Sequence, residues 1–193
     1  GEYELYGAIN REEGILVGKE LTFVGQGVGK TTWKIGYRSD EYSGEDADYD
    51  LGGAEKITFE KMTLQCGTGD YHGFAYIWNT VVKDCVINGK TDYWGYTSAE
   101  FIDTTFNAPS SNYALWTYCS PIMTFDTCTF NASGKVINVY TDYSAGKHNI
   151  RVNFINCTVN SYSFGKQALN INDRNMGNCK YLSLIHISEP TRP

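Results

Sequence analysis

The sequence has little positive charge and no long apolar run. Its 193 residues include 16 Lys and Arg against 22 Asp and Glu, so the formal net charge is −6. Proteins hold a phosphate backbone mainly through an excess of Lys and Arg, and nucleic acid is therefore not an expected partner. No segment of about eighteen consecutive apolar residues is present, so we expect no membrane-spanning helix.

A nucleotide-binding loop is also missing, although residues 24–32 (VGQGVGKTT) look like one. The true motif needs a glycine five positions before the glycine of its Gly-Lys pair, and Val24 stands there. The motif must also open a helix, whereas the β-branched residues that follow alternate as in a strand. We therefore expect no bound nucleotide, and we interpret Gly25, Gly27 and Gly29 as a corner with positive φ angles.

The usual catalytic and zinc-binding patterns are absent. The six cysteines show no C-x₂₋₄-C spacing, which argues against zinc. The three histidines do not fall at equivalent positions, and no Ser/His/Asp or Cys/His group is visible. We therefore predict no catalytic residues and no resident cofactor, with calcium as the single open question.

One acidic segment is a weak candidate for a calcium site. Asp46, Asp48 and Asp50 alternate there, and hard cations favour flexible loops dense in carboxylates. The EF-hand pattern would need glycine and glutamate where Leu51 and Ile57 stand. A solvated loop is the default interpretation, and another type of Ca²⁺ site stays open.

What the sequence does contain is an internal repeat. Five segments share an apolar anchor, two mostly polar residues, a small or sulfur-containing residue, one further residue, an apolar residue and an amide. They recur at intervals of about 20 to 30 residues, which is near one turn of a solenoid. We expect the bend of each turn within the two polar residues. The segments are FEKMTLQ from Phe59, VKDCVIN from Val82, FIDTTFN from Phe101, FDTCTFN from Phe125 and FINCTVN from Phe154.

The repeat predicts an all-β fold of the parallel β-helix type, in which short strands stack and like residues lie above one another. Residues 19–35 fit an earlier turn, with Leu21 and Phe23 in the anchor strand. Side-chain amides hydrogen-bond along such a stack. A sandwich of short strands is the alternative fold. The expected amide ladder consists of Gln65, Asn88, Asn107, Asn131 and Asn160.

A second row of the repeat contains Cys85, Cys128 and Cys157, with Met62 and Thr104 at the equivalent positions. This mixture indicates a row that needs small or soft core residues, so we predict buried free thiols. Stacked positions rarely present their Cβ atoms at the angle that a disulfide needs. Three further cysteines fall outside the row and receive no role: Cys66, Cys119 and Cys179.

Another set of alternating stretches lies between the repeat segments. Its mostly apolar positions, such as Leu115 and Ile137, are expected to face the core, and the opposite positions to face solvent. Rings can stack on sugar C–H faces and amides can reach sugar hydroxyls, so we hypothesise a polysaccharide-binding face. Alternatively, the loops 141–149 and 161–166 cover this face, or stacked rings merely stiffen the fold. The expected rows are Tyr76, Tyr96, Tyr118 and Tyr140, and beside them Trp94, Trp116, Asn138 and Asn170.

From about Leu21 to Asn172 the sequence resembles the right-handed β-helix repeat proteins found among surface and secreted proteins of gut bacteria. The F-x-x-C-x-F/V-N segments carry this resemblance, together with the stretches ASGKVINVY and KQALNIND. It implies a right-handed single-stranded parallel β-helix, the architecture shared with pectate-lyase-like enzymes, and an extracellular or cell-surface location. It implies little about function, because such solenoids host lyases, hydrolases, adhesins and stalks.

The C-terminal segment from Leu182 to Arg192 (LSLIHISEPTR) resembles the in-frame translation of a transposase mosaic-end sequencing adapter. We expect residues 182–193 to be a non-native tail, and His186 is therefore excluded from any site. The expected organisation is an incomplete N-terminal strand region at 1–18 followed by β-helix turns at 19–181, with the fold truncated at both ends.

These observations together predict an extracellular or cell-surface module that binds carbohydrate, mediates adhesion or acts as a spacer, with no catalysis evident. Its partner would be a polysaccharide or a glycan on a host or cell surface. The alternative is a fragment of a polysaccharide lyase or glycoside hydrolase of β-helix fold, which would need carboxylates converging on one face.

Overall fold

The computed structural model describes residues 16–34, 53–66, 73–89, 91–108, 113–119, 122–132, 135–140, 151–161, 169–172 and 187–188. Within these ranges the chain forms strands, bridges and turns, and no helix occurs there. The strands belong to two sheets, and the pairs within both sheets are parallel. The described part of the chain is therefore all-β.

The larger sheet divides into two branches at β7. The C-terminal half of β7 pairs with β10, whereas its N-terminal half pairs with β9. The nine strands of this sheet are β1 (Glu20–Val24), β3 (Lys56–Glu60), β5 (Gly73–Lys83), β7 (Thr91–Ile102), β9 (Tyr113–Cys119), β10 (Ile122–Asp126), β12 (Lys135–Tyr140), β13 (Arg151–Ile155) and β15 (Leu169–Asn172).

The smaller sheet consists of short strands that follow one another in the order β16-β14-β11-β8-β6-β4-β2. Strands that are adjacent in this sheet are therefore also consecutive among its strands along the chain. The seven strands are β2 (Thr32–Lys34), β4 (Thr63–Gln65), β6 (Val86–Asn88), β8 (Thr105–Ala108), β11 (Thr129–Ala132), β14 (Cys157–Ser161) and β16 (Ile187–Ser188). Of these, β16 lies within the segment that resembles an adapter, and it pairs with β14.

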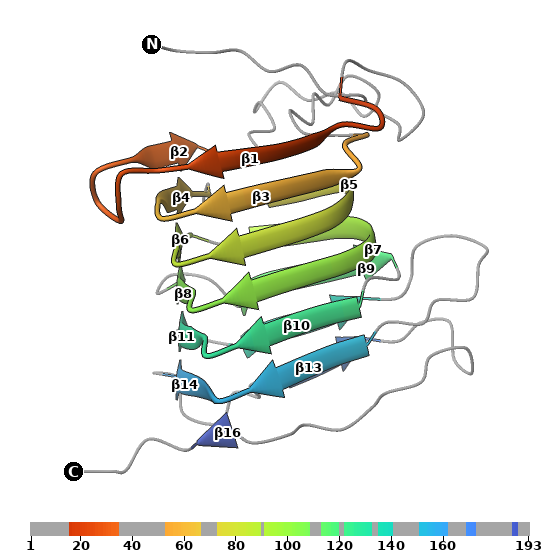
Figure 1. The fold of residues 1–193 in the computed structure, drawn as a ribbon. Coiled ribbons are helices and arrows are strands. Elements are labelled where there is room, and N and C mark those ends of the chain that lie inside the picture. The colour runs from red at the N-terminus through yellow and green to blue at the C-terminus, as the bar shows by residue number, and fades with distance from the viewer. Residues whose placement is uncertain are drawn as a thin grey trace, which may run out of the picture.

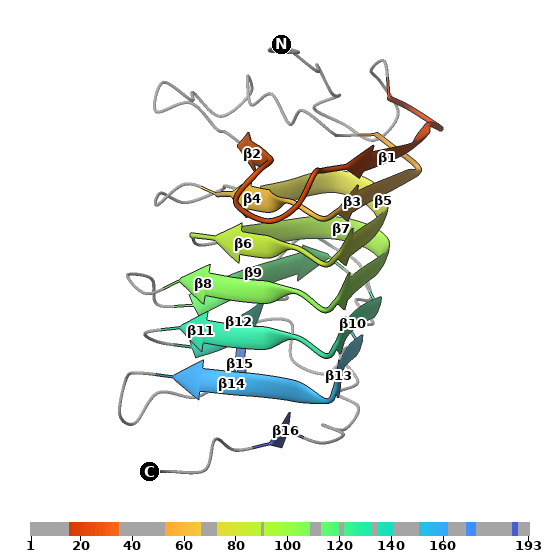
Figure 2. The ribbon, with the colours of Figure 1, turned by 60° about the vertical axis from the view of Figure 1, so that its left-hand side comes forward.

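The two sheets rise side by side as a regular stack. β1, β3, β10 and β13 lie above one another in one layer, together with the ends of the long strands β5 and β7 (Figure 1). Turned by 60°, the structure shows β2, β4, β6, β8, β11 and β14 stacked in the same order beside that layer (Figure 2). Each passage of the chain thus adds one strand to each layer.

The strand register aligns the repeat segments as the sequence predicts. Phe59 pairs with Val82, and Val82 pairs with Phe101. Phe101 pairs in turn with Phe125, and Phe125 pairs with Phe154. β1 joins β3 in the same register, so the expected earlier turn is also present. The periodicity in the sequence therefore corresponds to residues that lie directly above one another.

The chain bends between the two sheets at a residue in the left-handed conformation. One such residue occurs in each of the five repeat segments, with a φ angle between 46° and 56°. Each is the second of the two polar residues within which the bend was expected. The backbone amides of the first four along the chain donate to a carbonyl of the following turn: the amide of Asp103, for example, donates to the carbonyl of Asp126 at 3.0 Å. Asn and Asp tolerate this conformation better than most residues. The five are Lys61, Asp84, Asp103, Thr127 and Asn156.

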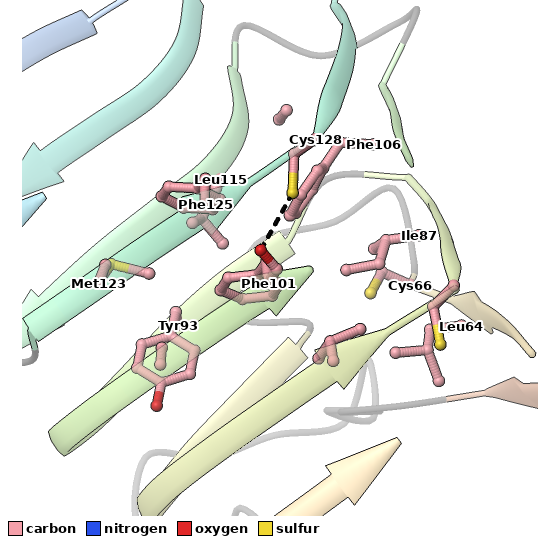
Figure 3. Packing of buried hydrophobic residues seen from close by; sticks show 14 of the residues in the cluster. Leu64, Cys66, Ile87, Tyr93, Phe101, Phe106, Leu115, Met123, Phe125 and Cys128 are labelled. Carbon is pink, nitrogen blue, oxygen red and sulfur yellow. Dashed lines mark hydrogen bonds between the residues drawn. The ribbon is translucent and has the colours of Figure 1, made fainter. Parts of the chain in front are cut away.

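The core lies between the sheets and contains two columns of stacked rings. In the larger sheet the rings of Phe101 and Phe125 are 5.0 Å apart and nearly parallel, and in the smaller sheet those of Phe106 and Phe130 are 4.8 Å apart. Between the columns the rings meet edge to face, as Phe125 and Phe130 do at 5.3 Å. Figure 3 shows Phe101, Phe106 and Phe125 in this packing. Both arrangements are favoured ring geometries, so each turn offers the next a matching surface.

The loop between β1 and β2 forms the corner predicted for the glycine-rich segment. Gly27 and Gly29 have positive φ angles of 133° and 77°, as expected. Gly25 does not, and the prediction for this residue is wrong. A Cβ atom at Gly25 would collide with the carbonyl oxygen of Lys61 and lie 2.8 Å from the Cβ of Met62. The residue is therefore glycine because two backbone segments approach closely, and not because of its dihedral angles.

The left-handed corners lead to a stability prediction. Thr127 is β-branched and has a φ of 56°, a combination that is sterically unfavourable. We expect Thr127→Asn to stabilise the protein by about 1 kcal/mol, measured by urea unfolding. The reverse change at the equivalent corner, Asn156→Thr, should destabilise it by a similar amount. Equal stabilities for both variants and the parent would show that these corners carry no strain.

Candidate binding faces

The backbone of the predicted aromatic face differs from the expected rows on both sides of β7. Tyr76 and Tyr96 do not lie opposite each other, because Ile77 pairs with Gly95 at an irregularity in the β5/β7 register. Trp116 pairs with Asn138, and Asn138 pairs with Asn170, as the sequence predicts. Trp94, however, pairs with Tyr118 and not with Trp116. The two registers differ by two residues, and a shift of two keeps every side chain on the same side of the strand. Alternation in the sequence therefore could not distinguish them.

The expected exposure of this face is wrong at Asn138, whose side chain is only 4% exposed. Ala114 and Val136 lie on the same side of β9 and β12 as Asn138 by their alternation, and each is 1% exposed. Both sides of these strands are thus buried at the described positions, as is common in parallel sheets. For the seven other predicted ligand-binding residues the structure describes the backbone and not the side chain: Tyr76, Trp94, Tyr96, Trp116, Tyr118, Tyr140 and Asn170.

The weak calcium candidates Asp46, Asp48 and Asp50 lie outside the described residues. In the part of the chain that the structure describes, no three His, Cys, Asp or Glu side chains come together in a way that could hold a metal ion. A Ca²⁺ site in the acidic segment stays a prediction from the sequence alone.

Two buried polar groups lie on the strands under this face. The Tyr93 hydroxyl is 3.1 Å from both the Thr80 hydroxyl and the carbonyl oxygen of Ser98, so it is well satisfied. The next strand pairs Thr117 with Tyr93. Thr117 is fully buried, and its hydroxyl has no hydrogen-bond partner in the described structure. A buried hydroxyl without a partner costs free energy, so this position is suboptimal for stability.

We expect Thr117→Val to raise the free energy of unfolding by about 1 kcal/mol, because it removes an unpaired buried hydroxyl at nearly constant volume. Thr80→Val is the matched control, since it deletes one of the two partners of the Tyr93 hydroxyl and should destabilise by about 1 kcal/mol. Urea unfolding measures both variants. A loss of stability in Thr117→Val would mean that this hydroxyl does have a partner.

The cysteine row lies inside the stack, and its members donate hydrogen bonds to backbone carbonyls of the preceding turn. Cys128 Sγ lies 3.2 Å from the carbonyl oxygen of Phe101 (Figure 3), and Cys157 Sγ lies 3.3 Å from that of Phe125. Thr104, the hydroxyl-bearing member of the row, makes the same contact with Val82 at 3.3 Å. A thiol and a hydroxyl can both fill this small space and donate. Four buried cysteines are free thiols: Cys66, Cys85, Cys128 and Cys157.

Burial raises the pKa of the Cys85 thiol, because the thiolate would lose its hydration. Cys128 and Cys157 are neighbours in the stack, and each thiol affects the ionisation of the other. The interaction with Cys157, followed by burial, raises the pKa of Cys128, whereas the interaction with Cys128 lowers the pKa of Cys157. Cys157 is nevertheless fully buried, so access and not ionisation limits its reactivity.

This burial predicts slow alkylation. In the folded protein we expect iodoacetamide to label Cys85, Cys128 and Cys157 at least about a hundredfold more slowly than in the urea-unfolded chain, because reaction requires local opening. Mass spectrometry of tryptic peptides assigns the labelled residues, and the unfolded chain is the control. Rapid labelling of Cys157 in the folded state would contradict the buried row.

The amide row forms a hydrogen-bonded ladder on the outer side of the smaller sheet. Asn160 donates to Asn131 at 2.9 Å, Asn131 donates to Asn107 at 2.8 Å, and Asn107 donates to Asn88 at 3.1 Å. Gln65 occupies the equivalent position one turn earlier, where its amide donates to the carbonyl of Cys66 at 3.0 Å. Each linking amide therefore has a fixed orientation.

A column of threonines runs beside this ladder, and the sequence-based prediction did not include it. The signal was present, because Thr stands two residues before the amide in four of the five repeat segments. In this column, the hydroxyls of Thr105, Thr129 and Thr158 make no hydrogen bond within the described structure. All three side chains are half-buried. We name the combined surface the Thr/Asn face, defined by Thr105, Asn107, Thr129, Asn131, Thr158 and Asn160.

The two sheets differ in the charge of their outer sides. From β4 to β14, the outward positions of the smaller sheet contain only Thr, Val, Asn and Gln. The outward positions of the layer formed by β3, β5, β7, β10 and β13 include a charged side chain on every strand. These are Lys56, Glu60, Lys83, Glu100, Asp126 and Arg151.

In comparisons with known proteins, no family model matches the chain, and neither a curated protein nor a solved structure shows significant similarity to it. A separate observation concerns membranes: the described residues include no helix with the length and apolar character needed to cross one.

Proposed function

We propose that the chain is a right-handed single-stranded parallel β-helix that acts as an extracellular or cell-surface module and binds polysaccharide without turning it over. The parallel pairs, which add one strand to each layer at every passage, support the fold. Parallel strands joined by crossovers are right-handed in nearly all proteins, which supports the handedness. The resemblance to surface and secreted β-helix repeat proteins supports the location.

The observation that carries the function is the repetition of identical side chains on an outer sheet face. Threonines and asparagines recur there at the same positions on successive turns. A partner that is itself a polymer of similar units can repeat one weak contact many times, and linked weak contacts give useful affinity. Polysaccharides are the extracellular polymers that offer hydroxyl groups at every unit.

The cysteines are compatible with an extracellular location. Four of them are buried free thiols, and burial protects thiols from oxidation and exchange. Stability in an oxidising environment then depends on the packed columns of rings and on backbone pairing, without a requirement for disulfides.

Incubation with insoluble polysaccharides tests the proposal. We expect the protein to sediment with at least one polysaccharide of a panel that includes cellulose, chitin, xylan and pectin. No new reducing ends or unsaturated uronic acid products should appear in the supernatant, with or without Ca²⁺. Heat-unfolded protein controls for non-specific adsorption.

Two outcomes would contradict the proposal. Release of products, especially Ca²⁺-dependent release from uronic acid polymers, would establish the lyase alternative. Failure to sediment with any of the polysaccharides, while the protein remains folded, would leave a spacer role and remove the binding function.

A further inference from the structure

We propose that the Thr/Asn face is the binding site and that its ligand is an uncharged polysaccharide. This inference rests on the proposed function and adds to it the site and the chemical class of ligand. It places the site on the smaller sheet, away from the aromatic strands that the sequence suggested.

The absence of charge is the first argument. Charged residues make up 20% of the sequence, yet none occupies an outward position of the smaller sheet between β4 and β14. Strands usually place charged side chains on a solvent-facing side, where they also oppose unwanted association. A surface without them suits a partner that is itself uncharged, because neither side must give up the hydration of an ion.

The free hydrogen-bonding capacity of the face is the second argument. Among the described residues, the hydroxyls of Thr105, Thr129 and Thr158 have no hydrogen-bond partner, and each can donate once and accept twice. Each linking amide, such as that of Asn131, uses one N–H and one carbonyl lone pair in the ladder. One N–H and one lone pair per amide remain for a ligand. Every turn therefore offers both donors and acceptors, which is what a polyhydroxylated ligand requires.

The spacing and rigidity of these groups are the third argument. Equivalent groups on neighbouring turns lie about 4.8 Å apart, and the Thr and Asn of one strand are about 6.6 Å apart. The units of an extended β-linked glycan succeed one another at a distance close to that between turns. The ladder bonds hold the amides in one orientation, so binding costs little side-chain entropy.

The net charge of the chain determines which glycans fit. With a net charge of −6, the protein repels polyanions such as polygalacturonate. A polycation would be attracted by the net charge of the whole chain and would not need the Thr/Asn face. A neutral glucan or mannan avoids the repulsion and gains nothing from the net charge.

Native affinity electrophoresis tests the inference with lichenan and glucomannan as neutral probes and polygalacturonate as the anionic probe. The test variant is the triple substitution Thr105→Val, Thr129→Val and Thr158→Val, which removes three hydroxyls and keeps the strand shape. The control carries three Thr→Val substitutions on the outer side of the larger sheet, at the exposed Thr22, at the buried Thr58 and at Thr124, whose hydroxyl accepts a hydrogen bond from Asn153. Circular dichroism and thermal melting establish that both variants fold.

We expect a neutral probe to retard the parent protein and the control equally. The triple variant of the Thr/Asn face should bind at least about tenfold more weakly, because three hydrogen bonds to the ligand are lost. Polygalacturonate should retard none of the three proteins. If the triple variant does not fold, Thr129→Lys replaces it, since a long charged side chain on this half-buried position blocks the flat face.

The remaining outcomes separate the inference from the proposed function. Undiminished binding of a neutral probe by the triple variant would overturn the site and leave polysaccharide binding intact. Retardation by polygalacturonate alone would overturn the ligand class. If no polysaccharide retards the parent protein, the binding function itself fails, and the inference fails with it.

Discussion

The in-register parallel pairing of successive turns is the constraint on which the rest of this structure depends. Since each strand pairs with its own equivalent in the next turn, a side chain finds its counterpart directly above and below it. Rings therefore stack on rings in the core, as Phe101 does on Phe125, and amides bind amides outside, as Asn131 does with Asn107. A residue that cannot stack on itself is costly at such a position, and this is why the sequence repeats.

The same constraint connects the fold to the proposed function. A side chain that faces out on one turn faces out on all of them, so a surface property is multiplied along the stack. On the larger sheet this multiplication produces a charged, ordinary protein surface. On β8, β11 and β14 of the smaller sheet it produces an uncharged, regular array of hydroxyls and amides. Only the second surface repeats the hydrogen-bonding groups that a repeating hydroxylated ligand can bind.

The sequence was most informative where one residue type recurs on every turn and least informative elsewhere. The anchor column from Phe59 to Phe154 could be aligned because large apolar residues recur at one position. Trp94 could not be placed, because a shift of two residues preserves alternation, and the register that sets Tyr93 beside Thr117 is defined only in the folded sheet. Burial of Asn138 was also invisible in the sequence, since alternation indicates the side of a strand and not what covers it.

By itself, the sequence determined the β class, the level of each repeat segment in the stack, the position of the bends and the rows formed by the repeat segments. These follow from local periodicity and from side chains that must match their own equivalents. Tertiary structure alone decided that Gly25 is needed for close backbone approach, that the aromatic strands are buried on both sides at the described positions, and that a threonine column lies open beside the amide ladder. The physical reason is that exposure and close approach depend on which segments come together across the stack, and periodicity along one strand carries no information about them.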